Sequence, residues 1–373
     1  MNKTIGIFGG GQLGRMMAQA ALPLNIQCTF FEVDTDCPAA ILGTVFSTKS
    51  EQGLQDFIAS ADVFSLEFEN TPINYVDVLT QSKTLHPPRL ALATAQNRLA
   101  EKALFDELNI PVAPYRAVDS LDSLKQAVVD LGLPIVLKTV TGGYDGKGQF
   151  VLRTENQIDT AWAELGPAKS LVAESFVQFS REVSIIAVRG QNGDVKTWSL
   201  AENHHHNGIL SHSIVPAPNS ADLQPVAQDY ITRLLNHLNY VGVLTLELFV
   251  TEQGLFANEM ACRVHNSGHW SIEGAVCSQF ENHIRAVAGL PLGLTEVIRP
   301  TVMINIIGQH PKSEAVLALN GAHLHLYNKS ERTGRKLGHI TLMPNNSDEL
   351  TDLCRQLAKI LPVPLALTTD MNI

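Results

Sequence analysis

The residues from Thr141 to Gly148 combine a flexible backbone with positive charge. Four glycines occur in this stretch, and glycine lets a backbone approach a ligand closely because it has no Cβ atom. Lys138 precedes the stretch and Lys147 lies within it. Exposed backbone N–H groups beside two cations suit a polyphosphate. The alternative is an ordinary hairpin turn, since glycine-rich turns also join strands that bind nothing.

Two glutamates are spaced so that they could share a metal ion. The alternation in Gly242–Val250 predicts a strand with Glu247 on its polar face. Glu252-Gln253-Gly254 predicts a three-residue hairpin loop, and closing it about Gln253 sets Glu247 opposite Glu259. Because like charges across a ladder destabilise it, this pair needs a cation or a raised pKa. Mg²⁺ held by these carboxylates and by substrate phosphates fits, whereas a shifted register would leave two surface acids.

Polar and aromatic residues follow this hairpin directly. Arg263 and His265 suit the binding of a small oxyanion. His265 and His269 have the spacing of zinc ligands on a helix, but Ser267-Gly268 weakens any helix there, so zinc is not favoured.

Three consecutive histidines, His204, His205 and His206, form a second candidate metal site. Neighbouring residues on a strand point to opposite faces, so the three cannot bind one ion from a strand. Within residues 202–208 we therefore expect a solvated turn for at least two of the three histidines, instead of a metal site.

The elements that position these groups begin with an N-terminal strand, turn and helix. The strand Thr4–Phe8 leads into a GxGxxG turn formed by Gly9, Gly11 and Gly14, which predicts a phosphate at a helix N-terminus. Glu32 ends the second strand, about 20 residues beyond the turn, where a dinucleotide-binding fold has its ribose ligand. An NAD-dependent oxidoreductase therefore remains an alternative, and so does a turn whose glycines serve packing alone.

A third strand, Val63–Leu66, runs into Glu67 and Glu69. Open α/β sheets bind ligands at the carboxyl ends of their parallel strands, so these acids are site candidates. At positions i and i+2 they would share a face if the strand continued. A solvated loop is the alternative.

The remaining elements divide the chain further. Pro87-Pro88 marks a boundary, and residues 89–108 predict helices whose polar face, Asn97 to Lys102, includes Arg98 as a surface ion-pair residue. Helices are expected over 120–131 and about 155–164, with strands over 134–138, 149–152, 170–174 and 181–188, forming a small α+β lobe. Residues 302–307, 323–327 and 340–342 predict strands of a small C-terminal cap that packs on the nucleotide lobe.

Composition limits the possible function classes. A chain of 373 residues suffices for two or three domains. The net charge of -10 argues against a general nucleic-acid binder, because such a protein needs a basic face. The five scattered cysteines fit a reducing cytoplasm, and no apolar run approaches the length of a membrane span.

Together these residues resemble the ATP-grasp superfamily and, within it, the N5-carboxyaminoimidazole ribonucleotide synthase family of bacterial purine biosynthesis. The resemblance covers essentially the full length, and its most specific motifs are Gly11 to Met16, Glu67 to Asn70, Thr141 to Gln149, Asn258 to Met260, Arg263 to Trp270 and Gly334 to His339. It implies α/β and α+β structure: a Rossmann-like domain over 1–95, an ATP-grasp domain over 96–290 with its small lobe at about 111–178, and a C-terminal domain over 291–373.

The resemblance also implies an ATP site with Mg²⁺ or Mn²⁺. The metal would lie on Glu247 and Glu259, the backbone of Glu174 to Val177 would contact the adenine, and Glu182 would bind the ribose. The full set implied for ATP is Arg98, Lys138, Gly143, Tyr144, Asp145, Gly146, Lys147, Gly148, Gln149, Glu174, Ser175, Phe176, Val177, Glu182, His205, Asn258 and Glu259.

For the other substrates, the resemblance implies bicarbonate beside Arg263, His265 and Asn266, which with Lys138 form the catalytic group. The residues implied for aminoimidazole ribonucleotide are Gln12, Leu13, Arg332 and Lys336 at its phosphate and Glu69, Tyr144 and Asp145 at its imidazole. The GxGxxG turn would then serve a mononucleotide, which leaves Glu32 without a dinucleotide ribose. A homodimer that binds small molecules only, and neither nucleic acid nor membrane, is expected.

Two alternatives within reach of the same residues remain. A formate-dependent glycinamide ribonucleotide transformylase uses the same scaffold, and a non-catalytic nucleotide sensor would need no reactive centre. The sequence also departs from the family, which usually has proline in place of Cys262 and often in place of Val264. That departure concerns the stiffness of the loop from Arg263 to Trp270, not its charged groups.

Overall fold

A five-stranded parallel sheet forms the N-terminal part of the chain in this computed structural model, which describes residues 3–142, 148–168 and 170–362. The strand order is β3-β2-β1-β4-β5. Its elements are β1 (Thr4–Phe8), α1 (Gln12–Ala21), β2 (Gln27–Glu32), β3 (Val45–Ser47), α2 (Gly53–Ala59), β4 (Val63–Leu66), α3 (Ile73–Leu79) and β5 (Thr84–Leu85). The glycine turn between β1 and α1 therefore lies where the sequence predicts it, at the carboxyl edge of a parallel sheet.

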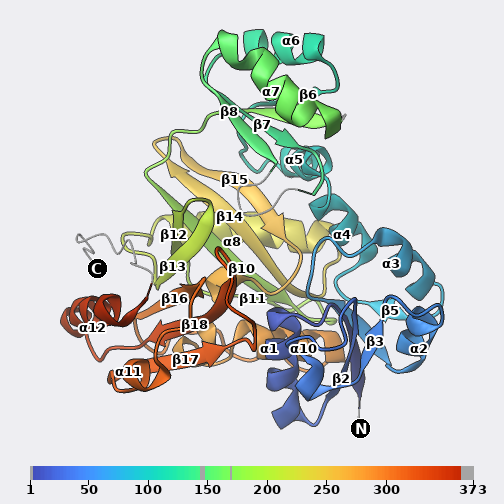
Figure 1. Cartoon of the computed structure of the whole chain (residues 1–373), viewed down its shortest axis with the longest axis vertical. Coiled ribbons are helices and arrows are strands. Elements are labelled where there is room, and N and C mark those ends of the chain that lie inside the picture. The colour runs from blue at the N-terminus through green and yellow to red at the C-terminus, as the bar shows by residue number, and fades with distance from the viewer. Residues whose placement is uncertain (1–2, 143–147, 169, 363–373) are drawn as a thin grey trace.

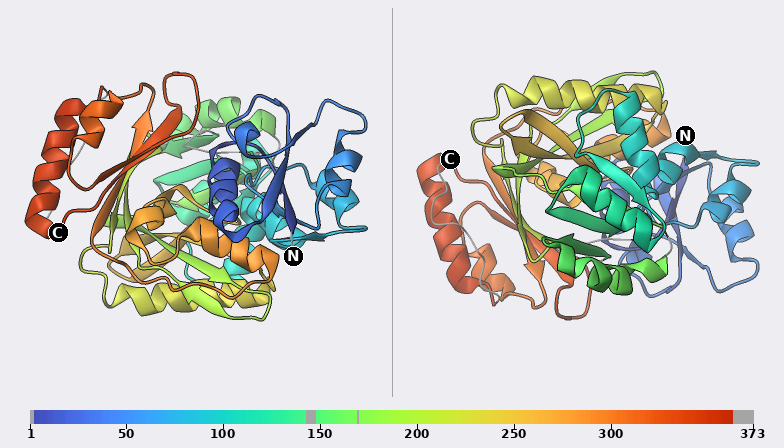
Figure 2. Two further views of the ribbon diagram at one scale, coloured as in Figure 1. Left: turned by 90° about the horizontal axis from the view of Figure 1, so that it is seen from below. Right: turned by 90° about the horizontal axis from the view of Figure 1, so that it is seen from above.

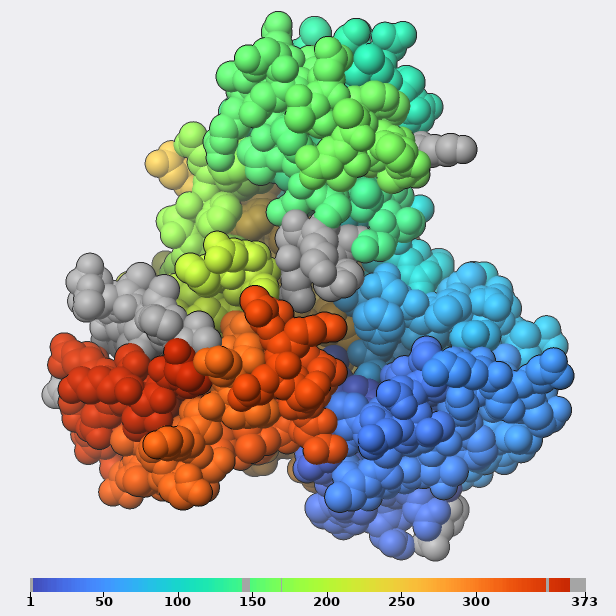
Figure 3. Space-filling model, in the orientation of Figure 1, coloured from blue at the N-terminus to red at the C-terminus, as the bar shows by residue number. Residues whose placement is uncertain are grey.

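A small lobe stands apart from the rest of the molecule, at the top of Figure 1 and Figure 3. Helices α4 (Arg89–Ala95) and α5 (Arg98–Glu107) lead to it from the N-terminal domain. Its antiparallel sheet has the order β6-β9-β7-β8, and α6 and α7 pack against that sheet. The bounds are β6 (Tyr115–Val118), α6 (Leu121–Leu131), β7 (Ile135–Thr139), β8 (Gln149–Leu152), α7 (Ile158–Leu165) and β9 (Leu171–Ser175).

The rest of the chain forms one nine-stranded antiparallel sheet. The order is β15-β14-β10-β12-β13-β16-β18-β17, with β11 paired to β10. The strands are β10 (Arg181–Arg189), β11 (Val195–Thr197), β12 (Ala201–His206), β13 (Ile209–Val215), β14 (Gly242–Thr251), β15 (Gly254–Ala261), β16 (Thr301–Ile307), β17 (Ala322–Leu326) and β18 (Lys336–Leu342). The helices are α8 (Leu223–His237), α9 (Ser271–Gly274), α10 (Gln279–Ala288), α11 (Ser313–Leu317) and α12 (Ser347–Ile360).

The C-terminal strands continue this central sheet. Strand β16 pairs with β13, so backbone hydrogen bonds join the last part of the chain to the middle part. Residues of α11 and α12 cover the sheet there with a separate apolar cluster. Figure 2 shows α12 and the N-terminal domain at opposite sides of the molecule. The expected C-terminal strands are confirmed, and their fusion to the sheet explains how this segment stays in place.

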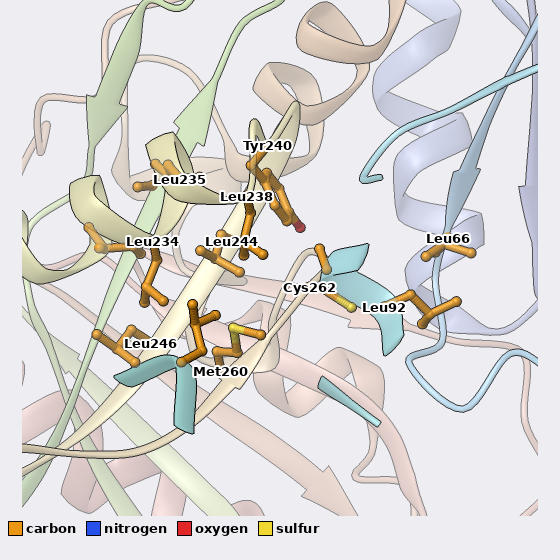
Figure 4. Close-up of a cluster of buried hydrophobic side chains, with 14 of the residues drawn as sticks. Leu66, Leu92, Leu234, Leu235, Leu238, Tyr240, Leu244, Leu246, Met260 and Cys262 are labelled. Atoms are coloured by element: carbon orange, nitrogen blue, oxygen red, sulfur yellow. The ribbon is translucent and has the colours of Figure 1, made fainter. Parts of the chain in front are cut away.

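One apolar cluster fixes the N-terminal domain against the central sheet. Figure 4 shows Cys262 between Leu66 of β4 and Leu92 of α4 on one side and Leu244 and Met260 of the β14–β15 hairpin on the other, and all five belong to one apolar cluster. A leucine that becomes fully buried contributes about 1.5–3 kcal/mol to folding. Because the cluster crosses the two parts, the ends of β4 and β15 are held at a fixed separation, which positions the acidic residues that follow them.

Two further features bear on the chemistry of the chain. All five cysteines are buried and none forms a disulfide. Among the described helices, none has both the length and the apolar character that crossing a membrane requires.

Candidate active site

The β14–β15 hairpin brings the two predicted metal-binding glutamates face to face. Glu247 pairs with Glu259, as expected. The predicted three-residue loop is wrong, because Thr251 pairs directly with Gly254 and only two residues form the turn. A β-bulge between Glu247 and Leu248 adds one residue to β15 and restores the pairing. Asn258 is the additional residue, and it stands next to Glu259 at the site.

Glu247 is an ionised, mostly buried carboxylate. Its Oε1 lies 3.1 Å from Nε2 of His265. Burial raises the pKa of Glu247, but its contact with His265, together with His205 and Arg263, outweighs burial and lowers this pKa to about 2. A carboxylate that stays charged at neutral pH is the form that a divalent cation requires.

Glu259 is paired with the first residue of α5. Nη1 of Arg98 donates to its Oε2 at 3.1 Å. Glu101, one turn along α5, is buried and accepts the backbone N–H of Met260 at 2.7 Å. Burial, with the nearby charge of Glu259, raises the pKa of Glu101 to about 8. Arg98 forms an ion pair as predicted, but it is mostly buried and not at the surface, and Glu101 and Lys102 of the same polar face are buried because α5 turns this face inward.

Lys138 belongs to a buried cluster of three charges. Its Nζ and that of Lys102 each lie 3.1 Å from Oε2 of Glu174, and the side chains of Lys102 and Glu174 are only 2% and 7% exposed. Burial raises the pKa of Glu174, but Lys138 and Lys102 more than offset this and lower it below its ordinary value. Two ammonium groups share one carboxylate, so the cluster carries one excess positive charge. Lys102 could not be predicted as a member, since an isolated lysine in a polar helix segment gives no sign of burial.

The strand end implied for adenine has few free backbone groups. The N–H of Ser175 donates to Pro114 and that of Phe176 donates to Pro134. Among the described residues, the N–H of Val177 has no such partner, so it is the donor that this segment leaves for a base. The side chain of Glu174 faces the lysines, away from that role.

The histidine run lies on a strand. His204, His205 and His206 end β12, so the predicted solvated turn is wrong for these three and holds only for Asn207-Gly208. Nδ1 of His205 lies 3.2 Å from Oε1 of Glu182. Burial lowers the pKa of His205, but the hydrogen bond and charge of Glu182 outweigh burial, so this pKa is raised above its ordinary value. Strand pairing thus sets the residues implied for ribose and nucleotide side by side.

The loop after β15 is held by one glutamine. Gln279 accepts the N–H of His265 at 2.9 Å and donates to its carbonyl at 2.6 Å. Cys262 and Val264, which replace the family's prolines, are fully buried. The loop therefore has fixed attachments that do not depend on proline.

Two further predicted residues have partners on neighbouring elements. Nε of Arg263 lies 2.5 Å from Oε2 of Glu69, and the two residues are mostly buried. Burial raises the pKa of Glu69, but Arg263 outweighs it and lowers this pKa. Asn266 and Asn305 exchange amide hydrogen bonds of 3.0 and 2.8 Å. The end of β4 and the loop after β15 thus meet at one point.

A buried carboxylate occupies the glycine turn. Oε1 of Glu67 accepts the N–H of Gly11 at 2.6 Å, and Oε2 accepts that of Gly14. A Cβ atom built on Gly9 or Gly11 would stand 2.3 or 2.5 Å from Glu67. The glycines therefore make room for a side chain of the protein itself. A dinucleotide diphosphate would need the same N–H groups, so this geometry opposes the NAD alternative.

Glu32 and Glu67 therefore act on the turn and not on a ligand. Oε2 of Glu32 accepts the N–H of Gly10 at 3.0 Å. The expectation that Glu67 and Glu69 share a face fails because β4 ends at Leu66 and the two side chains diverge. Glu67 was a predicted site candidate, but its partners in the glycine turn were not predicted.

The N-terminus of α1 faces a basic segment near the C-terminus. Lys329 donates to Oε1 of Gln12. Burial, with the charge of Arg335, lowers the pKa of Lys329 to about 8. Arg332 is exposed and Lys336 is half-buried at the start of β18. A cavity of about 580 Å³ lies beside this contact, lined by Arg15, Ile41, His310, Leu326, Asn328, Lys329 and Ser330.

Part of the glycine loop is not described by the structure. Gly143, Tyr144, Asp145, Gly146 and Lys147 lie outside the described residues. At its far end, the carbonyl of Gly148 accepts the N–H of Thr139 at 2.9 Å. Gln149 begins β8 and pairs with Lys138, so the loop connects two adjacent strands as predicted.

Three family models match the chain in sequence order. They are the ribonucleotide synthetase preATP-grasp domain at residues 1–96, the ATP-grasp domain at 103–280 and the phosphoribosylaminoimidazole carboxylase C-terminal domain at 301–352. The ATP-grasp match contains the hairpin acids, Lys138 and Glu174, and Lys102 directly precedes it.

Curated relatives and solved structures agree with these matches. The N5-carboxyaminoimidazole ribonucleotide synthase of Vibrio cholerae is 44% identical over 95% of this chain and 94% of the relative. The synthetase structure from Thermus thermophilus superposes with a TM-score of 0.92 at 43% identity, over 96% of this chain and 99% of that one. An Aspergillus clavatus synthase in complex with ADP and 5-aminoimidazole ribonucleotide superposes with a TM-score of 0.88 at 28% identity, covering 96% and 98%.

Proposed function

The chain belongs to the N5-carboxyaminoimidazole ribonucleotide synthase family, whose members are ATP-grasp carbon–nitrogen ligases of purine biosynthesis, and we propose that it uses the residues described above to join bicarbonate to 5-aminoimidazole ribonucleotide at the expense of ATP. The observation that carries the proposal is that Arg98 links the two groups of charges: it pairs with Glu259 of the acidic hairpin, and the charge of Glu174 in the lysine cluster also acts on it. Glu247, opposite Glu259, contacts His265. These groups could hold a polyphosphate and a small oxyanion next to each other.

The hairpin acids fit a divalent cation. Glu247 is ionised, and Glu259 faces it across the ladder with a partly exposed side chain. Within the described ranges, no three histidine, cysteine or acidic side chains are arranged to bind a metal by themselves. Two carboxylates therefore suit Mg²⁺ or Mn²⁺ that takes its remaining oxygen ligands from ATP. When bound, the ion would neutralise charge on the β- and γ-phosphates.

ATP would lie between the small lobe and the central sheet. Arg98 and Lys138 stand on the phosphate side, and the excess positive charge of the Lys102–Glu174–Lys138 cluster attracts the polyphosphate. We propose that Val177 donates its N–H to the adenine and that Glu182, next to His205, binds the ribose. The glycine loop would close over the phosphates and exclude water.

Bicarbonate must be activated because it is a poor electrophile. We propose that one of its oxygens attacks the γ-phosphorus, so that a P–O bond forms while the bond to ADP breaks. The resulting carboxyphosphate releases phosphate and CO₂ within the closed site. The exocyclic amine of the ribonucleotide then attacks CO₂, forms the new C–N bond and loses one proton. Arg263, His265 and Asn266 would hold the oxyanion during these steps.

The ribonucleotide would bind between α1 and β18. The N–H groups of Gln12 and Leu13 have no partner among the described residues, whereas Glu67 occupies those of Gly11 and Gly14. A 5′-phosphate would therefore bind at Gln12 and Leu13, with Lys336 and Arg332 as its counter-charges. Glu69 would face the imidazole, together with Tyr144 and Asp145 of the loop.

Three further features belong to the proposal. We propose domain boundaries at residues 95 and 290. We also propose that the protein acts in the cytoplasm, because five reduced cysteines are compatible with a reducing compartment. We also propose a homodimer. The exposed apolar side chains Val276, Leu294 and Ile298 supply surface that such an interface would use. Light scattering of the purified chain tests the dimer.

An ADP-release assay with isotope-labelled bicarbonate tests the function. ADP should form only when aminoimidazole ribonucleotide and bicarbonate are both present, and the label should appear in an acid-labile carbamate. ADP formation with glycinamide ribonucleotide and formate would favour the transformylase alternative instead. ATP binding without turnover under all of these conditions would favour the nucleotide sensor.

A further inference from the structure

A row of buried polar side chains runs away from His265 across three strands. Oγ of Ser267 lies 2.8 Å from Nδ1 of His265 and 2.8 Å from Oγ of Ser184. Asn203 donates its amide to Ser184 at 2.9 Å and accepts the hydroxyl of Ser213 at 2.8 Å. The four residues behind the histidine are 0–6% exposed.

The sheet itself sets this row in place. Ser184 lies on β10, Asn203 on β12 and Ser213 on β13, and the register pairs Asn203 with Ser213 directly. Buried polar groups destabilise a fold unless each finds a partner. A row in which every member is hydrogen-bonded fixes the orientation of all its groups.

The hydrogen bonds in this row run in one direction. The amide of Asn203 supplies a hydrogen to Ser184, and its carbonyl takes one from Ser213. Either hydroxyl could donate in the contact between Ser184 and Ser267. Because Ser184 already accepts from Asn203, we take Ser184 as the donor, which leaves the hydroxyl of Ser267 to donate to Nδ1 of His265.

An independent contact gives the same result. The backbone N–H of Ser267 also points to Nδ1 of His265, at 3.3 Å. A nitrogen that receives N–H and O–H donors must be the acceptor of the neutral ring, so the ring hydrogen is on Nε2. That Nε2 lies 3.1 Å from Oε1 of Glu247.

We propose that the row Ser213–Asn203–Ser184–Ser267 holds His265 in the tautomer with its hydrogen on Nε2. The ring then donates a hydrogen bond toward Glu247 and offers no lone pair to the site. The consequence for the reaction rests on the function proposed above. His265 then orients a metal-binding carboxylate or an oxyanion through the hydrogen on its Nε2. The four residues of the row are positioning residues, because they act through the ring.

Nitrogen NMR of the whole chain labelled at histidine tests the tautomer without substrates. Spectra of a His265→Gln variant identify the signal by its loss. The wild-type ring should show a hydrogen on Nε2 and an acceptor at Nδ1. In Ser184→Ala the row is interrupted, so the form with hydrogen on Nδ1 should become populated. Ser213→Ala, which breaks only the far end, should produce a smaller change in the same direction.

Activity supplies the second readout. In Ser184→Ala, kcat should fall roughly tenfold, about the value of one buried hydrogen bond, with KM for ATP nearly unchanged. The matched control is Ser65→Ala, because Ser65 forms another buried serine–histidine contact, 2.7 Å from Nε2 of His283. That variant should leave the His265 signal as in the wild type.

Two results would overturn the proposal. One is a wild-type ring with its hydrogen on Nδ1. The other is a Ser184→Ala variant that folds, keeps the wild-type His265 signal and yet loses activity, since the row would then serve stability alone. Both outcomes are independent of the carboxylation assay, because the spectra are recorded on the free chain.

Discussion

The shared carboxylate of Glu174 should be the most sensitive charge in the small lobe. Glu174→Gln keeps the shape of the side chain and removes its charge. Lys102 and Lys138, each 3.1 Å from that carboxylate, would then face a neutral amide at a largely buried position. Breaking a buried ion pair by removing one partner costs about 3–5 kcal/mol. Deprotonation of one lysine limits the cost, so we expect the lower part of that range.

The pH dependence follows from the lowered pKa of Glu174. Such a group contributes its full stabilisation above the pKa that it has in the unfolded chain, and this contribution is lost as pH falls through the lower, folded value. The difference in free energy of unfolding between wild type and Glu174→Gln should therefore be largest at neutral pH. It should shrink once the pH falls below about 4.

Urea unfolding measures the effect, and hydrogen exchange of peptides containing β7 and β9 reports on the lobe separately. Asp130→Asn is the matched control, because Asp130 pairs with Arg116 on the same lobe at an exposed position, 3.0 Å apart. Exposed pairs contribute little, so this variant should resemble the wild type. If Glu174→Gln is no more destabilised than Asp130→Asn at neutral pH, the three-charge cluster does not have the role given to it.

Three other substitutions test the site. Glu259→Ala should abolish ATP turnover and weaken Mn²⁺ binding measured by calorimetry, while the circular dichroism spectrum stays unchanged. Wild-type-like activity with Mg²⁺ would refute the metal assignment. Glu67→Gln should raise KM for aminoimidazole ribonucleotide more than KM for ATP, because its amide cannot accept both turn N–H groups. Glu32→Gln, which affects only Gly10, should change KM less, and equal effects would contradict this explanation. Gln279→Ala removes the partner of both backbone groups of His265. We therefore expect kcat to fall about tenfold or more, and the free energy of unfolding to fall by roughly 1–3 kcal/mol. An unchanged kcat would show that other contacts hold the loop.

Much of the architecture could be predicted because its signals are local. Glycines follow β1 directly, and alternating residues mark β14, so these strands were predicted with bounds close to those observed. The pairing of strands far apart in the sequence has no such signal. Nothing in residues 301–307 indicates that β16 bonds to β13, which lies about 90 residues earlier in the chain.

The charged site was predictable only in part, since partners come from separate elements. Lys102 and Lys329 were missed, and the partners of Glu67 were not predicted. Lys102 is on a helix that turns inward, Glu67 reaches the glycine turn between β1 and α1, and Lys329 meets Gln12 across almost the whole chain. Each of these depends on a tertiary contact, and burial of a polar residue cannot be deduced from local periodicity when its partner is distant.

The hairpin shows how a functional prediction can be correct for an incomplete reason. A turn of three residues would set Glu247 opposite Glu259 with regular pairing, whereas the observed two-residue turn would set Glu247 opposite Asn258. The bulge beside Glu247 shifts the register by one residue and restores the acidic pair. It also leaves Asn258 and Glu259 as consecutive half-buried residues, where strict alternation would bury one of them. The irregularity therefore serves the site, because it brings an amide and a carboxylate to the same face, next to the carboxylate of Glu247.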